Sequence, residues 1–439
     1  MNLQQLQLEF RDFAQYSPGV RAVLSRIQRW RARSPGVSDP QGLARSIRGL
    51  TSAARLTMSE PYLRTIEAEL SRRVAVLDTD RIDWSEFIPN LSPPRLTKSV
   101  ILKPYLGPTE KGVVFISFPY NWVRLLTLSK VKEFASRYSL VVAPSWSRPH
   151  DLISYVFPKA WPDPIHTLIS NQKDLDYFPR ISSKYRPVPL YASSWVDPDL
   201  FHPTPRASRE FDLVMVANFG RFKRHFAFFR ALSTMRKSLK VLLIGQDQDG
   251  RTDQTVREEA KAYGVQDRFE LQRDAPHQDV VDALCRSRVS LVLSRREGSC
   301  VVIAESLFAD TPAALLADAE IGSRAFINDH TGRLLEHRDL GRQLESFIDH
   351  ADAFEPRRWA MANISCARSH DRLNQAVKAS LMEDGQTWTR DLAEFCWRPD
   401  PVLLHAEDQK MMDAERRAII ERFGVAIGDE FSSGADAAR

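Results

Sequence analysis

The residues best suited to chemistry lie in one stretch, SRREGSCVVIAESLFADTP at 294–312. A buried strand is expected to end at its first residue, and after a four-residue turn a helix is expected to begin near Ser299. The backbone N–H groups of Ser299, Cys300 and Val301 would have no helical partner and would point out of the carboxyl edge of a sheet. With the helix dipole, and with Gly298 letting a ligand approach the main chain, these amides predict a seat for a phosphate.

Two glutamates flank this seat. Glu297 lies in the turn, and Glu305 is the only ionisable residue in the apolar run VVIAESLFA. A buried carboxylate needs partners, and sugar hydroxyls supply them well. The alternatives are an acid that favours a helix N-terminus for Glu297 and a salt bridge to an arginine for Glu305. Two acids around one phosphate seat favour the ligand-binding interpretation.

A cationic loop is expected to complete the seat. The segment VANFGRFKRH at 216–225 leaves a strand at Asn218 and opens a helix with Lys223, Arg224 and His225. A cation on this loop could neutralise a diphosphate leaving group, which gains negative charge as the bond to it breaks. The alternative is a solvated cluster of charges, which is common for such runs.

The elements that must position these residues alternate between apolar strands and helices from about residue 72. Such alternation predicts crossover connections and mainly parallel sheets, and near-continuous apolar strands indicate burial on both faces. Pro and Ser cluster at 187–208, where we place a domain boundary. The expected strands are 73–78, 99–104, 112–118, 140–145, 165–170 and 186–191 before the boundary, and 211–217, 239–245, 268–272, 288–294 and 311–317 after it.

The predicted fold class is α/β, with two Rossmann-like doubly wound domains facing a cleft and helical extensions at both ends. After about residue 340 the sequence is predicted to be helical to its end. The predicted parts are a helical extension at 1–70, a first Rossmann-like domain at 71–205, a second at 206–345, C-terminal helices at 346–427 that pack back across the domains, and a disordered tail at 428–439.

Charge and cysteine content bear on compartment and partners. The net charge of the 439 residues is only +5, and residues 1–60 alone hold nine Arg against four acids. The four cysteines, in no metal-ligand spacing, predict buried thiols in a reducing compartment. Because neither a signal peptide nor a membrane span is recognisable, we expect a cytoplasmic protein. No nucleic-acid partner is expected, since so small an excess comes without a recognised module.

The Arg-rich start is amphiphilic. In PGVRAVLSRIQRWRARS at 18–34 the apolar residues recur at intervals of three and four, and arginines fill the other faces. One interpretation is a surface helix docked on the body of the protein. The other is a helix facing anionic lipid, on the inner face of a membrane, or one side of an acceptor groove.

Four motifs together resemble a known family. SSWVDPDLFHP (193–203), VANFGRFKRH (216–225), EGSCVVIAE (297–305) and DHTGRLL (329–335) occur in the order found in retaining glycosyltransferases of the two-Rossmann-domain (GT-B) fold. The resemblance is to the large family 4 type group, which includes sucrose synthase and bacterial mannosyl- and glucosaminyltransferases. It covers about residues 190–340.

The resemblance implies a role for each site residue. Glu297 would hold hydroxyls of the transferred sugar, Glu305 would bind the ribose of the nucleotide, and the amides at 299–301 would meet the diphosphate. Lys223 would be the diphosphate-binding lysine. The family usually has an Arg five residues before this lysine, where this sequence has Asn218, and Arg221 or Arg224 is a candidate substitute. Loops 245–250 and 272–278 would form walls of the pocket.

The N-terminal half departs further from the family. The glycine pair that often follows the first strand is absent from FISFPYNW at 115–122. For the His that the family places near the sugar, the candidates are His150 and His166, each with a structural role as the alternative.

The resemblance implies a metal-independent hexosyltransferase that uses a nucleoside-diphosphate sugar as donor substrate, needs no cofactor and retains the anomeric configuration. The acceptor is not specified: a glycan, a lipid, a small molecule and a protein all remain open. The alternative is a non-catalytic nucleotide-sugar-binding or scaffold protein that keeps the fold.

Overall fold

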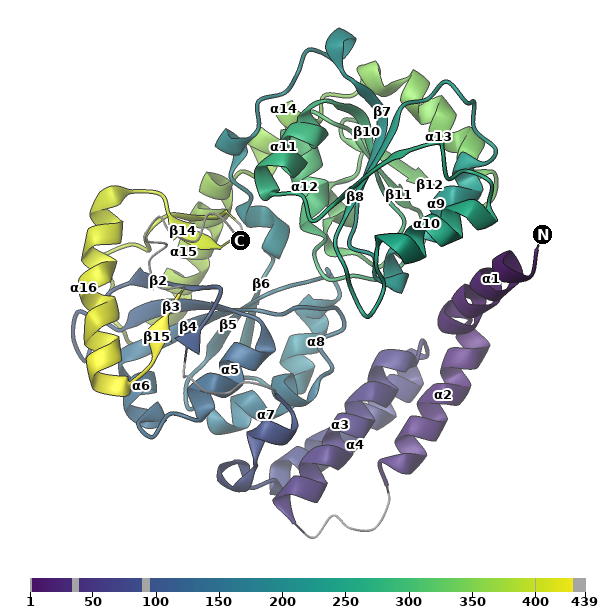
Figure 1. Ribbon diagram of the computed structural model, residues 1–439. Helices are drawn as coiled ribbons and strands as arrows, with labels where there is room; N and C mark the ends of the chain where they lie inside the picture. The colour runs from purple at the N-terminus through teal and green to yellow at the C-terminus, as the bar shows by residue number, and fades with distance from the viewer. Residues whose placement is uncertain (1, 34–38, 89–94, 399, 429–439) are drawn as a thin grey trace. The chain divides into compact units, whose positions relative to one another are not determined.

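The computed structural model describes residues 2–33, 39–88, 95–398 and 400–428 (Figure 1). The chain divides into two compact units. Unit 1 comprises Met1–Asp12 and Tyr191–Ser369, and unit 2 comprises Phe13–Leu190 and His370–Arg439. Each unit contains its own β-sheet with helices between the strands, which confirms the predicted α/β fold class. That the two units face one cleft stays a prediction.

Unit 1 is built on a six-stranded sheet in which every neighbouring pair is parallel. Its strand order is β12-β11-β10-β7-β8-β9. The strands are β7 (Phe211–Val216), β8 (Val241–Gly245), β9 (Glu270–Arg273), β10 (Ser287–Val292), β11 (Ala313–Leu316) and β12 (Gly332–Leu335). The helices between and after them are α9 (His225–Leu232), α10 (Asp253–Ala262), α11 (His277–Cys285), α12 (Val301–Phe308), α13 (Leu340–Asp349) and α14 (Pro356–Asn363).

The order of these strands determines where a ligand can bind. The chain proceeds from β7 to β8 and β9 on one side, then returns to place β10, β11 and β12 on the other side of β7. The direction of winding therefore changes between β7 and β10. In open α/β sheets such a change leaves a crevice at the carboxyl ends of the two strands. The loops carrying Lys223 and Glu297 follow these two strands.

Gly245, at the end of β8, shows how tightly this edge of the sheet is packed. A Cβ atom added there would lie 2.4 Å from Cε1 of Phe219 and 2.5 Å from the carbonyl oxygen of Ala217. Because the second contact is with backbone, no rotamer change can relieve it. The absence of a side chain at Gly245 lets the loop after β7 lie directly against β8.

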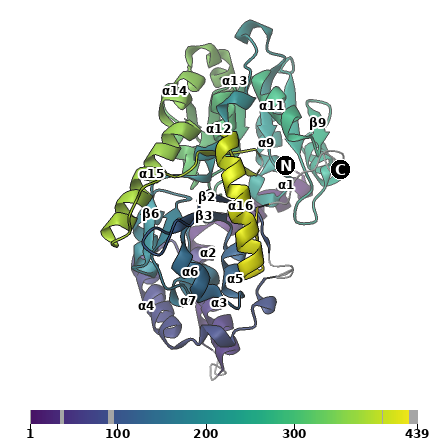
Figure 2. The same ribbon diagram turned by 90° about the vertical axis from the view of Figure 1, so that its left-hand side faces the viewer.

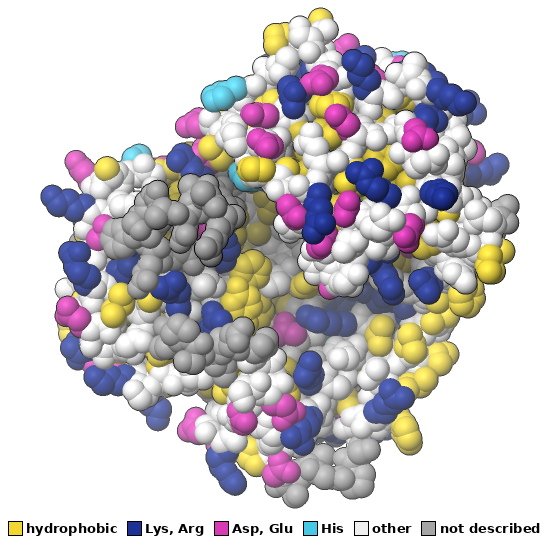
Figure 3. Space-filling model, viewed as in Figure 1, with side chains coloured by type: hydrophobic (Ala, Val, Ile, Leu, Met, Phe, Trp, Pro, Cys, Tyr) yellow, Lys and Arg dark blue, Asp and Glu magenta, His cyan; other side chains and the backbone are white. Residues whose placement is uncertain are grey.

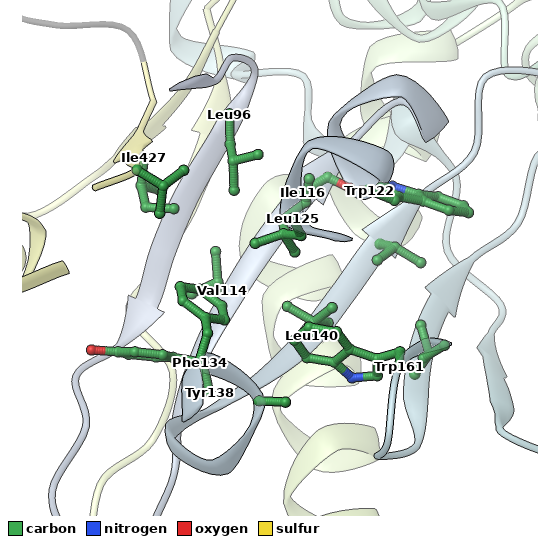
Figure 4. Packing of buried hydrophobic residues seen from close by; sticks show 14 of the residues in the cluster. Leu96, Val114, Ile116, Trp122, Leu125, Phe134, Tyr138, Leu140, Trp161 and Ile427 are labelled. Atoms are coloured by element: carbon green, nitrogen blue, oxygen red, sulfur yellow. Dashed lines mark hydrogen bonds between the residues drawn. The ribbon is translucent and has the colours of Figure 1, made fainter. Parts of the chain in front are cut away.

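Unit 2 contains a five-stranded sheet in the order β2-β3-β4-β5-β6. The first pair is antiparallel and the others are parallel. The strands are β2 (Ser99–Lys103), β3 (Gly112–Ser117), β4 (Tyr138–Ala143), β5 (Ile165–Leu168) and β6 (Tyr185–Val188), and the helices between them are α5 (Pro119–Leu126), α6 (Val131–Arg137), α7 (Leu152–Ala160) and α8 (Asp174–Ile181). Figure 4 shows apolar side chains from β3, β4, α5 and α6 meeting in one cluster.

The C-terminal segment adds to this cluster. Helix α16 (Ala406–Phe423) packs against β2, and Figure 2 shows it running along the sheet. The strand β15 (Ala426–Ile427) pairs in parallel with β1 (Arg95–Leu96), and Ile427 and Leu96 both enter the core. The chain leaves unit 1 and returns to unit 2 within α15 (Cys366–Glu383), between Ser369 and His370.

The N-terminal helices of unit 2 form a second cluster. α2 (Pro18–Arg31), α3 (Pro40–Leu56) and α4 (Glu60–Val76) follow α1 (Leu3–Tyr16), and α3 and α4 pack against α7. The inner positions of α3 are small or aliphatic and fully buried, Ala44, Ile47 and Ala54 among them. Of the described helices, none is long and apolar enough to cross a membrane.

Several expectations about individual elements are wrong. Residues 73–78 continue α4 to Val76 instead of forming a strand, because the apolar residues there extend a helical pattern that begins at Leu63. The end of the chain is not wholly helical, since β13 (Phe395–Trp397) and β14 (Pro401–Leu403) form an antiparallel pair. The strand β12 was not among the expected strands.

The observed units also differ from the predicted domain boundaries. Unit 1, which contains the predicted second domain, begins at Tyr191 and not at 206, and it also includes residues 1–12. Of the predicted tail at 428–439, all but the first residue lie outside the described residues. All four cysteines are free and buried, as expected for buried thiols.

Candidate functional site

A pocket of about 300 Å³ opens at the carboxyl ends of β7, β8 and β10 in unit 1. The loops after these strands supply most of its wall, and the first turns of α11 and α12 supply the remainder. It is lined by Val216, Ala217, Asn218, Lys223, Ile244, Gly245, Gln246, Asp274, Ala275, His277, Val280, Glu297, Cys300, Val301, Val302 and Glu305. The pocket thus lies where the change in winding direction predicts a crevice.

Lys223 and Glu297 meet in this pocket. The Lys223 ammonium donates to both carboxylate oxygens of Glu297, at 2.7 Å each. The two side chains are only 12% and 9% exposed. Burial acts to lower the pKa of Lys223, but its interactions with Cys300 and Glu297 outweigh burial and raise the pKa overall. The lysine is therefore held as a cation beside a carboxylate, a neutral pair that still offers unused hydrogen-bonding capacity.

Helix α12 points its N-terminus at the same space. Cys300 precedes the helix in the left-handed conformation, with φ 54° and ψ 76°, so the helix begins at Val301 and not near Ser299 as predicted. Cys300, Val301 and Val302 line the pocket. The N–H groups in the first turn of a helix have no acceptor within it and favour negative charge.

Gly298 and Ser299 are not among the residues that line this pocket, and their predicted contact with a diphosphate stays a prediction. The carbonyl of Gly298 accepts from the Gly322 amide at 2.9 Å, and the Ser299 hydroxyl accepts from the Ser193 amide at 2.8 Å. Both residues thus connect the turn to neighbouring segments of unit 1. The left-handed conformation of Cys300 separates Gly298 and Ser299 from the first turn of α12, which faces the pocket.

Glu305 occupies the next turn of α12 and also lines the pocket. Its Oε1 atom lies 3.0 Å from Nε2 of His277, the first residue of α11. The hydrogen bond with Glu305 raises the pKa of His277 above its ordinary value, although burial opposes this. The predicted salt bridge to an arginine, the alternative for Glu305, is replaced by this contact with a histidine.

His277 is a pocket residue that was not among the predicted site residues. Its loop, 272–278, was expected to form a pocket wall, but no motif singled out the histidine. The usable signal is its place, since loops that follow parallel strands meet at one edge of the sheet. Asp274 and Gln246 reach the pocket for the same reason.

The His277–Glu305 pair predicts a pH-dependent contribution to stability. Because the folded-state pKa of His277 is raised above the ordinary value of 6.5, the pair stabilises the fold fully below that pH. The contribution is lost as the pH rises through the raised pKa. We expect His277→Gln to lower the free energy of unfolding by no more than about 1 kcal/mol, because the histidine is partly exposed.

Denaturant unfolding at several pH values checks this expectation, with His350→Gln as the control. His350 is exposed, and its ring bonds a backbone carbonyl of the same helix. The deficit of His277→Gln should be largest at acidic pH and should shrink toward alkaline pH. A deficit that grows with pH would show that the pair is not charged in the folded state.

Comparison with known families gives a match within unit 1. Residues 197–359 match the family described as Glycosyl transferases group 1. The matched residues include all those that line the pocket. No curated protein sequence gives a significant match to the chain.

Solved structures give the fold. Sucrose-phosphate synthase from Thermosynechococcus elongatus superimposes with a TM-score of 0.50 at 15% identity, covering 62% of this chain and 74% of that one. Anabaena HepE, solved in complex with UDP, gives a TM-score of 0.49 at 13% identity over 60% of this chain and 78% of that one. The similarity to the first of these structures shows that the chain has the GT-B fold.

The loop after β7 carries the residues for which an arginine arrangement was expected. Asn218 lines the pocket, and its Oδ1 atom accepts from the Gly220 amide at 3.1 Å. Arg221 is exposed, and neither it nor Arg224 lines the pocket. Among the described residues that line the pocket, Lys223 is the one cationic side chain of the Lys or Arg type. That Arg221 or Arg224 substitutes for the expected arginine stays a prediction.

Arg224 instead connects the pocket loop to α1. It is buried in the left-handed conformation with φ 59°. Its guanidinium donates to both carboxylate oxygens of Asp12, at 2.7 and 2.9 Å, and to the carbonyl of Leu293 at the end of β10. One arginine thus links α1 to the two strand ends that carry Lys223 and Glu297.

We expect Asp12→Asn to lower the free energy of unfolding by about 1–3 kcal/mol, because the buried guanidinium loses a charged acceptor. The same variant should raise the KM for the donor more than it lowers kcat, since the loop next to Lys223 loses its anchor. Glu9→Gln is the matched control. Glu9 pairs with Arg230 at 2.6 Å in a more exposed position, so its loss should affect stability less and leave the KM unchanged. An unchanged KM in Asp12→Asn would remove the anchoring role.

His150 and His166 belong to unit 2. His150 is fully buried, and its Nε2 atom lies 2.9 Å from Oε1 of Glu67, whose other oxygen accepts from Arg180. His166 is buried within β5, and burial lowers its pKa to about 4. These environments suit a structural role for each, and their predicted contact with the sugar stays a prediction.

Proposed function

We propose that the protein transfers a sugar from a nucleoside-diphosphate sugar to an acceptor, with retention of the anomeric configuration and without a metal ion. The observation that carries the proposal is the buried Lys223–Glu297 pair at the N-terminus of α12. Glu305 lines the same pocket one turn after the start of this helix. A cation, a helix N-terminus and two carboxylates in one small pocket suit a ligand with a diphosphate between two hydroxyl-rich sugars.

In this proposal the diphosphate lies between Lys223 and the first amides of α12. As the glycosidic bond breaks, negative charge develops on the leaving phosphate, and both groups stabilise it without rearrangement. The Lys223 charge performs the part that a divalent cation performs in other transferases. Among the described residues, no group of three or more His, Cys, Asp or Glu side chains could hold a metal ion.

The carboxylates would bind the two sugars. Each carboxylate oxygen of Glu297 accepts one hydrogen bond from Lys223 and retains capacity for hydroxyl donors of the transferred sugar. Glu305, oriented by His277, would accept from the ribose hydroxyls. Retention would follow if the leaving phosphate takes the proton of the acceptor on the face from which it departs, so that no separate base is needed.

We also propose a cytoplasmic site of action. Four free, buried thiols support a reducing compartment, where nucleotide sugars would reach the pocket directly. The donor nucleotide sugar is the proposed small-molecule partner.

The proposal is tested first with thermal shifts in the presence of UDP-, GDP- and ADP-sugars. A donor that binds only the native state stabilises it, so the midpoint of unfolding rises as the donor concentration is raised. The donor that gives the shift is then incubated with the enzyme without acceptor, and release of the free nucleoside diphosphate is measured. The configuration of the released or transferred sugar, read by NMR, tests retention, and added EDTA tests metal independence. Absence of both a thermal shift and donor hydrolysis would contradict the proposal.

A further inference from the structure

Helix α1 has two faces of different character. Its two acids are paired within unit 1: Asp12 with Arg224, and Glu9 with Arg230. Four of its apolar side chains recur at intervals of three and four residues, which places them on one face of the helix. These are Leu3, Leu6, Phe10 and Phe13, which are 72%, 46%, 70% and 63% exposed. The acids therefore attach the helix to the protein, and an apolar face is left open.

Helix α2 has the same division within unit 2. Its inner side is attached to α3, where Arg21 donates to the carbonyl of Arg55 and Ser25 donates to that of Ala53. Its outer side is again apolar: Val23, Leu24, Ile27 and Trp30 are 54%, 41%, 39% and 74% exposed. Figure 3 shows hydrophobic side chains on the surface along each of these helices as Figure 1 draws them.

The charges around these faces are all of one sign. From Phe13 to Arg33 the sequence contains no acid. Arg11, Arg26 and Arg31 are exposed, and within the described residues none of the three pairs with a carboxylate. Since Glu9 and Asp12 are already paired, the exposed and unpaired charges in the described part of α1 and α2 are arginines.

We propose that the outer faces of α1 and α2 dock on an anionic lipid surface. Helices that lie in a membrane interface place Trp, Phe and Leu among the acyl chains and keep cationic side chains at the level of the headgroups. Anionic headgroups attract each arginine near the surface, so the apolar and ionic contributions add. The proposal goes beyond sugar transfer and does not depend on it.

A second copy of the chain fits these faces poorly. A symmetric dimer would place the same face of each copy against the other. Every charge on the face is an arginine, so the contact would bring like charges together without an acid to neutralise them. A surface of anionic phospholipid supplies the missing negative charge and the apolar environment at once.

The test uses the full chain and sedimentation with vesicles. Vesicles of phosphatidylcholine alone are compared with vesicles that also contain phosphatidylglycerol. We expect binding to the anionic vesicles to be at least about tenfold tighter and to weaken as salt is added. The triple variant Phe10→Gln, Phe13→Gln, Trp30→Gln should lose at least about tenfold in binding. Replacement of Arg11, Arg26 and Arg31 by Gln should cost roughly fivefold per residue on anionic vesicles only.

Met382→Gln is the matched control, because Met382 is 53% exposed on α15 and lies outside both faces. It should bind vesicles as the wild type does. All substituted side chains are exposed, so unchanged circular dichroism and unfolding midpoints are expected. Equal recovery of the wild type with and without anionic vesicles would overturn the proposal. So would undiminished binding by the Phe10/Phe13/Trp30 variant, or a dimer in sedimentation velocity that this variant dissociates.

Discussion

Glu297→Gln is expected to lower the rate of sugar transfer by about a hundredfold or more, the loss found when one preorganised contact to a transition state is removed. The amide keeps the shape of the side chain but replaces one acceptor oxygen with a donor. It can therefore no longer accept from a sugar hydroxyl and from Lys223 at both positions. Initial rates with the donor identified by thermal shift, measured in kcat and KM, give the effect.

Glutamine is the better substitution here because the pair is buried. Glu297→Ala would leave the Lys223 ammonium without a partner, and breaking a buried ion pair costs about 3–5 kcal/mol. A loss of activity in that variant would thus combine chemistry with instability. The 2.7 Å contacts with Lys223 are the reason to expect this loss of stability in Glu297→Ala.

The matched control is Glu258→Gln, since Glu258 lies on the exposed side of α10 in the same unit. It should transfer sugar at the rate of the wild type. If Glu297→Gln has an unchanged unfolding midpoint and full activity, the carboxylate has no part in the reaction.

The arrangement of the pocket was largely predictable because it depends on local patterns joined by one topological rule. Apolar runs identified β7 and β10, and the carboxyl ends of neighbouring parallel strands lie at one edge of a sheet. Lys223 and Glu297 are 74 residues apart in sequence, yet each directly follows one of these two strands. Their contact therefore follows from the strand order. Glu305 was predictable from its isolation within an apolar helix.

The contacts of Arg224, Ser299 and His277 could not be predicted, because they join segments that no local pattern relates. Arg224 belongs to the same run of charges as Lys223, but its partner Asp12 is 212 residues away in an N-terminal helix. The role of Ser299 depends on the single left-handed residue Cys300, a conformation that sequence rarely indicates for a cysteine. The contact of His277 with Glu305 could be predicted only from the position of α11 relative to α12.

The same distinction explains the errors in secondary structure. Residues 73–78 contain a short apolar run that fits a strand, but Val74 and Leu77 pack against the helical cluster of unit 2 as α4 ends. The short pair β13–β14 has only three residues in each strand, too few for a periodic signal. In each case packing decided between local alternatives that the sequence left nearly equal.

Lys223→Met is expected to weaken the binding of the nucleoside diphosphate by roughly tenfold to a hundredfold. A hydrogen bond to a charged group contributes about 1.5–3 kcal/mol, and each 1.4 kcal/mol is a factor of ten in affinity. Titration calorimetry with the diphosphate measures this, and Lys237→Met, an exposed lysine of the same unit, is the control.

The single variant leaves Glu297 buried and unpaired, so the double variant Lys223→Met, Glu297→Gln is needed to interpret it. Removing both charges removes the cost of an unpaired buried carboxylate, and the unfolding midpoint should return toward that of the wild type. The affinity for the diphosphate should not return, because the cation that neutralises it is still missing. If the double variant regains both stability and affinity, Lys223 acts by holding Glu297 in place. If it regains stability alone, the lysine binds the diphosphate itself.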